Sequence, residues 1–283
     1  MTATESADAT AIEDVLKARF GETIAVDPSL QGLETLKHMA SRRVCRRYLD
    51  KPVDPKLLRL LLACALSSPS KSDLQQGDVV IVQDAAKRKA IMDLIPSMPW
   101  MKEAPIFLVF CGDAQRLPRI SALRGKPYPN DHLDAFFNST VDGAIVMTSF
   151  IAAAEAVGLG CCQISVVRDN CDVLRDTLAL PKRVVPIAGL CVGWPAGPGR
   201  LSARLAIDAR VHVDTYEAGK LEAQLDEYDR RRNAAEPGLR QRDTARWGEA
   251  PFYGWSEDKA RQYATPQRTD FGAFVRAQGF KLE

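Results

Sequence analysis

Four arginines lie within six residues of this chain, at Arg42, Arg43, Arg46 and Arg47, and Tyr48 follows them. Guanidinium groups stay charged and bind phosphate through two parallel hydrogen bonds, and a nearby helix N-terminus adds backbone N–H donors. The cluster therefore predicts a binding site for a phosphate and a polar ring. The competing interpretation is a solvated basic surface, because short basic runs are commonly exposed.

The overall charge argues against nucleic acid as the partner. The chain has 38 Lys and Arg against 36 Asp and Glu, which leaves a formal net charge of +2. No extended basic face follows from this balance.

Other catalytic residue types are sparse in the sequence. The three histidines, His38, His132 and His212, stand outside any G-x-S-x-G context, which disfavours acyl transfer by side chains alone. No H-E-x-x-H or C-x-x-C spacing occurs among the residues, so we expect no metal site. The neighbouring pair Cys161-Cys162 is interpreted as small buried hydrophobes in preference to a redox pair. The chemistry is therefore expected from a bound cofactor.

Composition predicts an ordinary soluble protein. The 283 residues are 46% hydrophobic, enough to bury a large core. The acidic first residues resemble no secretory signal, so cytoplasmic residence is the expectation. The longest apolar run, 144–154, is shorter than the roughly 18 residues of a membrane span, and it predicts a buried helix with no membrane contact.

Hydrophobic periodicity predicts an α+β sandwich with a mixed central sheet. The first expected helix lies within residues 1–28 and ends at Gly21, with Ile12, Val15, Leu16 and Phe20 on its apolar face. The other expected helices are 29 to the arginine cluster, 55–66, 85–94, 133–157, 173–178 and parts of 255–280. The expected strands are 79–82, 106–111, 162–166 and 185–192. Residues 67–76 form a polar loop, and residues 113–130 are expected to be a surface loop. The predicted division is an N-terminal extension, a core and a C-terminal helical arm, at 1–28, 29–204 and 205–283.

Several separated motifs agree in order and spacing with one known family. They are Arg42 to Arg46 with Tyr48 and Pro52-Val53, the serine-rich loop 67–75, Glu155 to Gly160 with the strand after it, the block Gly189 to Pro195, and Arg204. From about residue 33 to 204 the chain resembles the nitroreductase family of FMN-dependent enzymes, most closely its NADPH-preferring, oxygen-insensitive branch.

The resemblance implies a set of residues that contact FMN. The expected phosphate and flavin contacts are Arg42, Arg43, Val44, Arg46, Ser70, Ser72, Gln75, Gln163, Ile164, Ser165, Val166, Ser202 and Arg204. Val44 stands where the family usually has a hydroxyl, and Ser202 stands where it often has a lysine. Glycines are frequent in the family at the positions of Ser165 and Val166.

The resemblance also implies the reaction. The fold would be a domain-swapped homodimer with a mixed, mainly antiparallel sheet flanked by helices and with FMN at the subunit interface. NADPH or NADH would deliver hydride to flavin N5 in a ping-pong reaction that reduces nitroaromatics, quinones or similar small aromatic acceptors, with no catalytic side chain and no metal. Arg230 to Arg232 or Arg240 would receive the NADPH phosphate, or else form a solvated helix face.

Two alternatives remain open from the sequence. One is a flavin-dependent reductive dehalogenase of the same fold, which residues near the pocket such as 98–101 would decide. The other is a flavin-binding sensor or carrier without turnover, in which the two terminal extensions contact a partner.

Overall fold

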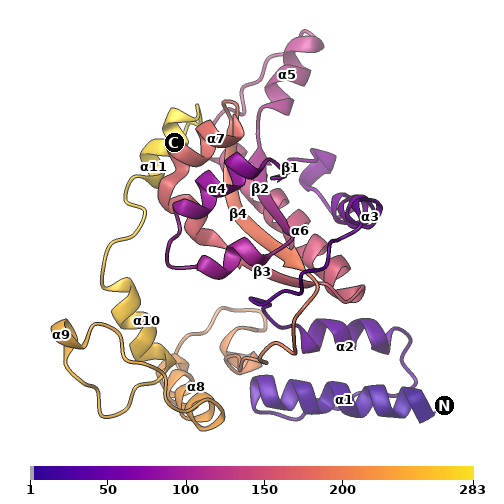
Figure 1. Cartoon of the computed structure of the whole chain (residues 1–283), viewed down its shortest axis with the longest axis vertical. Coiled ribbons are helices and arrows are strands. Elements are labelled where there is room, and N and C mark those ends of the chain that lie inside the picture. The colour runs from indigo at the N-terminus through magenta and orange to yellow at the C-terminus, as the bar shows by residue number, and fades with distance from the viewer. Residues whose placement is uncertain (1–2) are drawn as a thin grey trace. The chain divides into compact units, whose positions relative to one another are not determined.

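A computed structural model describes residues 3–283, and the chain divides into two compact units. The first, called here the arm unit, contains the residues up to 42 and residues 200–267. The second, called the sheet unit, contains residues 43–199 and 268–283. Each unit is therefore assembled from segments that are distant in the sequence (Figure 1).

The sheet unit is built around one antiparallel sheet of four strands. Their order is β1-β2-β4-β3, and their bounds are β1 Gly77–Ile81, β2 Ile106–Asp113, β3 Gly160–Ile164 and β4 Val184–Gly193. Strand β2 is buried along nearly its whole length. Because side chains alternate across a strand, such a strand must be covered on both faces.

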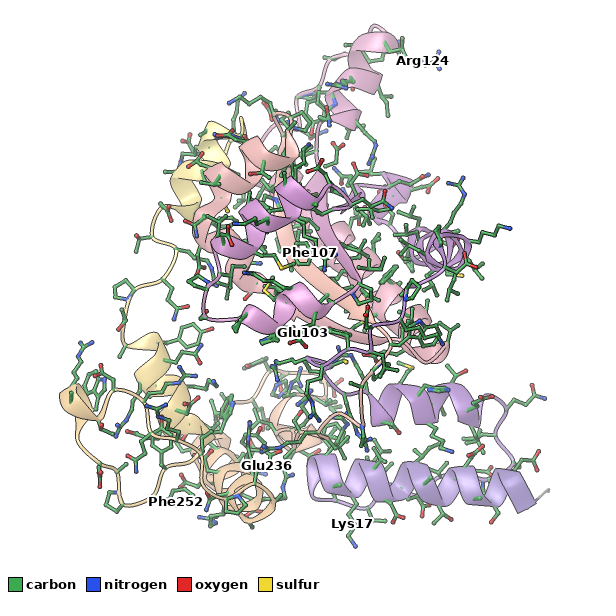
Figure 2. The ribbon with its side chains drawn as sticks, viewed as in Figure 1. Lys17, Glu103, Phe107, Arg124, Glu236 and Phe252 are labelled. Carbon is green, nitrogen blue, oxygen red and sulfur yellow. The ribbon has the colours of Figure 1, made fainter. Side chains whose placement is uncertain are left out.

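Helices supply both covers. The helices α3 and α6 pack on one face, and α4, α7 and the terminal α11 lie on the other, with bounds α3 Pro55–Leu66, α4 Ala85–Asp93, α6 Leu133–Ala156, α7 Cys171–Leu178 and α11 Phe271–Ala277 (Figure 1). Leu108 and Phe110 of β2 join the core with α6, where Phe110 and Phe150 make an edge-to-face pair. Phe107, labelled in Figure 2, belongs to the opposite core.

Two glycines let α6 approach the sheet closely. A Cβ on Gly143 would lie 2.7 Å from the carbonyl oxygen of Cys111, and one on Gly112 would lie 2.7 Å from that of Ser139. Neither position tolerates a side chain without a backbone shift. The close approach brings the middle of α6 beside the start of β1.

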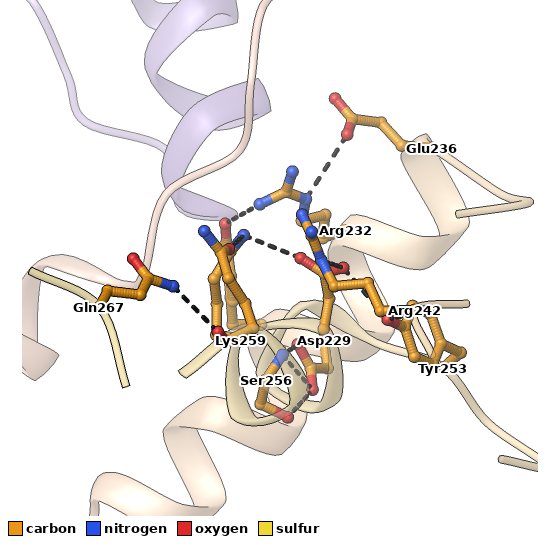
Figure 3. Close-up of polar contacts among 11 residues, drawn as sticks. Asp229, Arg232, Glu236, Arg242, Tyr253, Ser256, Lys259 and Gln267 are labelled. Carbon is orange, nitrogen blue, oxygen red and sulfur yellow. Dashed lines mark hydrogen bonds and ion pairs between the residues drawn. The ribbon is translucent and has the colours of Figure 1, made fainter. Parts of the chain in front are cut away.

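The arm unit is largely helical. Its helices are α1 Ala3–Phe20, α2 Leu33–Ser41, α8 Leu221–Ala235, α9 Thr244–Trp247 and α10 Trp255–Tyr263. Ala9 and Ile12 of α1 pack with Leu33 at the start of α2. Asp229 of α8 accepts hydrogen bonds from the backbone N–H and hydroxyl of Ser256, which fixes the first turn of α10 (Figure 3).

Most predicted elements are confirmed within a few residues, with three corrections. The second helix begins at Leu33 and not at residue 29. The segment expected as a surface loop contains the helix α5 Arg116–Leu123, which buries none of its residues and tolerates Pro118 because that residue lies in the first turn. The third strand ends at Ile164, and a 3₁₀ helix, Ser165–Asn170, replaces its expected last two residues.

Helix α6 is long and apolar enough to cross a membrane by length and composition alone. It packs along the sheet, however, and a core helix satisfies the same criterion.

Candidate functional site

The arginine cluster follows the edge of the sheet. Cys45 donates its backbone N–H to the carbonyl oxygen of Cys161 in β3 at 3.0 Å, and Val44 and Cys161 form a parallel bridge. This extended pairing buries Cys45 and Tyr48 and leaves Arg43 and Arg46 exposed. The structure thus places two of the predicted arginines on the surface beside β3.

Tyr48 anchors that segment. Its hydroxyl donates to the carbonyl oxygen of Cys45 at 2.8 Å and also lies 3.3 Å from that of Cys191 in β4. Burial raises the pKa of this phenol far above its ordinary range, so it remains a neutral donor. Val44, which replaces the family's usual hydroxyl, packs against the core beside Cys45. The apolar side chain at this position therefore contributes to folding.

The serine-rich loop between α3 and β1 is held in an unusual backbone conformation. Ser72, Asp73 and Gln75 have φ values of 50°, 55° and 51°, a left-handed region that costs non-glycine residues energy. Ser72 and Gln75 are exposed. The loop therefore presents a hydroxyl and an amide at the surface, as the predicted flavin contacts require.

A carboxylate that the sequence reasoning missed holds this loop. Asp142 of α6 is 1% exposed and accepts hydrogen bonds from Ser70 Oγ at 2.6 Å, from Lys71 N at 3.2 Å and from Gln76 N at 3.1 Å. Ser70 Oγ in turn accepts from Gln75 N at 2.7 Å. The hydroxyl of Ser70 therefore orders the loop, and its contact with a flavin stays a prediction. The available signal was an acid, Asp142, directly before the apolar run 144–154 of this helix.

The four predicted residues around the end of β3 differ in exposure. Gln163 and Ser165 are exposed, whereas Ile164 is 2% exposed and belongs to the core. Val166 packs partly against the same core. Gln163 and Ser165 can offer side chains to a ligand, and Ile164 can offer only its backbone.

In the arm unit, four arginines line one cavity of about 520 Å³. They are Arg19, Arg42, Arg204 and Arg210, and the remaining described residues that line it are apolar and include no carboxylate. Arg204 Nη1 donates to Ser202 Oγ at 2.5 Å, so the serine in place of the usual lysine orients the arginine. A cavity with several cations and no anion suits a phosphate.

The residues present therefore fit FMN in their chemistry. Within the arm unit, guanidinium groups that suit a phosphate line the cavity. Considered by itself, the sheet unit exposes hydroxyl and amide groups at the loop and at β3. Each unit supplies part of the predicted set, with Arg42, Ser202 and Arg204 in the arm unit and the other ten in the sheet unit.

The histidines occupy structural positions. His132 caps α6 by accepting from Asp134 N at 3.3 Å, and His212 stacks on Tyr216 with ring centroids 4.2 Å apart. His38 lies 3.9 Å from Glu34 on the same exposed helix. Within residues 3–283 no three His, Cys, Asp or Glu side chains gather in a metal-binding group.

The basic segment of α8 is largely engaged inside the arm unit. Arg232 donates to the Tyr228 hydroxyl at 2.9 Å and pairs with Glu236 at 3.5 Å (Figure 3). Arg231 donates to backbone carbonyls of Arg19 and Arg204, at 2.9 and 2.6 Å. Arg240 is exposed. Its role toward NADPH stays a prediction.

Two family models match most of the chain. The model described as "Nitroreductase family" matches residues 39–194, and that described as "Nitroreductase family, C-terminal domain" matches residues 202–283. The chain is 31% identical to an FMN reductase [NAD(P)H] of Bacillus subtilis (strain 168) over 88% of this chain and 99% of that protein. It is 32% identical to an oxygen-insensitive NADPH nitroreductase of Salmonella typhimurium over 68% of this chain and 80% of that protein.

Solved structures show the same architecture. The structure of B. megaterium NfrA2 superimposes with a TM-score of 0.79 at 28% identity, covering 88% of this chain and 99% of the other. The hypothetical oxidoreductase YcnD from Bacillus subtilis also gives 0.79, at 31% identity and the same coverage.

Proposed function

The chain belongs to the nitroreductase family, and from this premise we propose that it is an FMN-dependent NAD(P)H oxidoreductase that reduces small aromatic acceptors. The observation that carries the proposal is the near full-length likeness to an FMN reductase [NAD(P)H], together with the carboxylate-free arginine cavity. The acceptors are nitroaromatics, quinones and similar compounds. The protein acts in the cytoplasm.

FMN, when bound, would supply the redox chemistry, the ping-pong transfer of two electrons from NADPH or NADH to the acceptor. The chain's own residues bind and orient. Arg42 and Arg204 neutralise the phosphate, and Ser72, Gln75 and Gln163 offer hydrogen bonds to the polar edge of the ring. No side-chain nucleophile is needed.

Arg46 is assigned to the ring side of the flavin. Its guanidinium lies over the ring of Trp100, 6.0 Å from the ring centroid. A positive charge near the flavin N1 and O2 favours the reduced, anionic form. Arg46→Ala should therefore lower the flavin reduction potential, and an unchanged potential with normal FMN binding would remove Arg46 from this role.

The protein is proposed to act as a domain-swapped homodimer. Leu133, Phe137 and Val141 are 48%, 61% and 39% exposed and recur every four residues, so they form one apolar stripe along α6. Such a stripe fits a second copy of the chain. Phe137→Asp should halve the molar mass measured by light scattering, and a wild-type protein that is already monomeric would contradict the proposal.

The function is tested with the visible absorption spectrum of the purified protein. A flavin spectrum that bleaches on anaerobic addition of NADPH and returns on addition of nitrofurazone is the expected result. Flavin that NADPH reduces only slowly would indicate the sensor or carrier instead. Colourless protein that takes up no added FMN would refute the proposed function.

A further inference from the structure

One buried arginine lies outside the part of the chain that the family models match. Arg19 is in the last turn of α1 and is 5% exposed, whereas the matched regions begin at residue 39. A charged side chain is seldom this buried unless hydrogen bonds compensate its loss of water. Its partners therefore indicate what the helix does.

The Arg19 guanidinium binds three backbone carbonyl groups from two distant segments. Nε donates to Ala40 O at 2.5 Å and Nη2 donates to Arg42 O, both at the end of α2. Nη1 donates to Ser202 O at 3.0 Å. The last carbonyls of a helix lack partners within it, so Arg19 caps α2 and fixes the backbone of Arg42.

The backbone of Arg19 completes the connection. Its carbonyl oxygen accepts from Arg204 N at 2.6 Å and from Arg231 Nη1 at 2.9 Å. The other arm of the Arg231 guanidinium donates to Arg204 O at 2.6 Å. Both the backbone N–H and the backbone carbonyl of Arg204 are therefore hydrogen-bonded. The N–H binds Arg19 at the end of α1, and the carbonyl binds Arg231, which itself binds Arg19.

The helix ends in a way that permits this packing. Gly21 has a φ of 81°, and a Cβ there would lie 2.6 Å from Arg231 Nε. Only glycine combines that backbone angle with the close approach of Arg231. The end of α1 is therefore shaped around the guanidinium that supports Arg204.

We propose that Arg19 is a positioning residue that sets Arg42 and Arg204 for the FMN phosphate, so that α1 forms part of the cofactor site. The inference rests on the proposed function. Arg19, Arg42 and Arg204 line the same cavity, whose described lining contains no carboxylate. Arg19 acts through the backbones of the two arginines, so its effect belongs to the phosphate and not to the ring.

The test compares FMN with riboflavin, which lacks the phosphate. Affinities are measured by quenching of flavin fluorescence for wild type, Arg19→Met and Lys17→Met. Lys17 lies on the same helix, and its exposed side chain points outward from α1 (Figure 2). Lys17→Met therefore controls for the loss of a positive charge on α1. Arg19→Met should weaken FMN binding by about tenfold or more, the equivalent of about 1.4 kcal/mol. Riboflavin binding should stay within about twofold, and Lys17→Met should resemble wild type for both flavins.

A double-mutant cycle tests the route of action. If the Arg19 side chain works through Arg42, whose carbonyl oxygen it binds directly, Arg19→Met should cost much less affinity for FMN in an Arg42→Ala background than in wild type. Equal losses of FMN and riboflavin in Arg19→Met would indicate a merely structural role and overturn the inference, as would unchanged FMN affinity. Arg19→Lys, which keeps the charge but loses the three-way hydrogen bonding, replaces Arg19→Met if that variant does not fold. It should likewise lose FMN affinity selectively.

Failure of the inference and failure of the proposed function are separable. Wild-type protein that binds neither flavin refutes the proposed function itself. Wild-type protein that binds FMN tightly, together with an Arg19→Met variant that binds it equally well, refutes only the role of Arg19.

Discussion

At the scale of single residues, a buried carboxylate determines the shape of the loop that is proposed to meet the flavin. Asp142 accepts three hydrogen bonds from Ser70, Lys71 and Gln76 while it is almost fully excluded from solvent. Buried charges are retained when such bonds satisfy them. The oxygen atoms of Asp142 therefore fix the backbone conformation of the loop.

Asp142→Asn should weaken the hydrogen bonds that hold the loop. The amide nitrogen of asparagine is itself a donor, and it would face a backbone N–H donor. The expected cost is about 1–3 kcal/mol in the free energy of unfolding, with weaker FMN binding. Urea unfolding and a flavin titration measure the two effects. Asp134→Asn is the matched control, because it makes the same change on the same helix at a carboxylate whose side chain is 55% exposed. An Asp142→Asn variant as stable as this control would contradict the assignment.

The sequence could nominate residues whose side chains are proposed to meet the ligand. The spacing of Arg42, Arg43, Arg46 and Arg204 carries the family motif, so the sequence alone nominated them. Arg19 could not be found in that way, because its donors reach carbonyl oxygens at residues 40, 42 and 202. Every residue has a backbone carbonyl, so the sequence does not indicate which carbonyl groups accept these hydrogen bonds.

At the scale of elements, the loop between α3 and β1 combines backbone strain with exposure. Three of its residues adopt left-handed angles without being glycine. Such strain persists when the surroundings determine the conformation, and it concentrates at binding loops. The surroundings of this loop therefore maintain a strained conformation, and the strain lowers the free energy of unfolding.

Ser72→Gly should relieve part of that strain. We expect the free energy of unfolding to rise by about 0.5–1 kcal/mol, the difference between the left-handed penalty and the greater entropy of glycine. Ser121→Gly in α5 provides the comparison, because the same change inside a regular helix should lower stability by a similar amount. Thermal unfolding should show a higher midpoint temperature than wild type for Ser72→Gly and a lower one for Ser121→Gly. A loss of stability in Ser72→Gly would show that the loop is not strained there.

Helices and strands with strong periodicity were predictable, and elements defined by tertiary contact were not. The short continuous apolar run of β2 and the long apolar run of α6 predict their positions. Helix α5 carries Pro118 and buries no residue, so nothing in its pattern separates it from a loop. The 3₁₀ helix after Ile164 contains β-branched residues that favour a strand locally, yet the chain turns there.

At the scale of the whole molecule, six of the seven cysteines are buried and Cys64 is exposed. Buried thiols react slowly with thiol reagents, because the reagent cannot reach them and because a buried thiolate is costly to form. The native protein should therefore react with a thiol reagent at one site, and the unfolded protein at seven. Cys64→Ala should abolish the native reaction. Rapid native labelling at Cys161 or Cys162 would reopen the redox interpretation.

The same thiols predict an alkaline loss of stability. Burial raises the pKa of Cys171 to about 11 and that of Cys111 to about 12. The unfolded chain loses these protons near its ordinary thiol pKa of about 8.5, while the native chain keeps them, so native stability falls as pH rises above that value. The urea midpoint should decline from about pH 8.5 toward pH 11.

Removing one buried thiol gives the control for this decline. Cys171→Ala should make the decline between these limits less steep, because Cys111 still contributes to it. Cys64→Ala should leave the slope unchanged because that side chain is exposed. A wild-type midpoint that is constant across the range would contradict the prediction.

The path of the chain between its two units limits how such a protein can be recombined. The chain passes from one unit to the other three times, after residues 42, 199 and 267. Neither unit corresponds to one continuous stretch of the gene, and the matched C-terminal region, 202–283, contributes to both. A chimera that exchanges one unit with a relative therefore needs three crossovers, and a single crossover gives a hybrid in which at least one unit mixes the two parents.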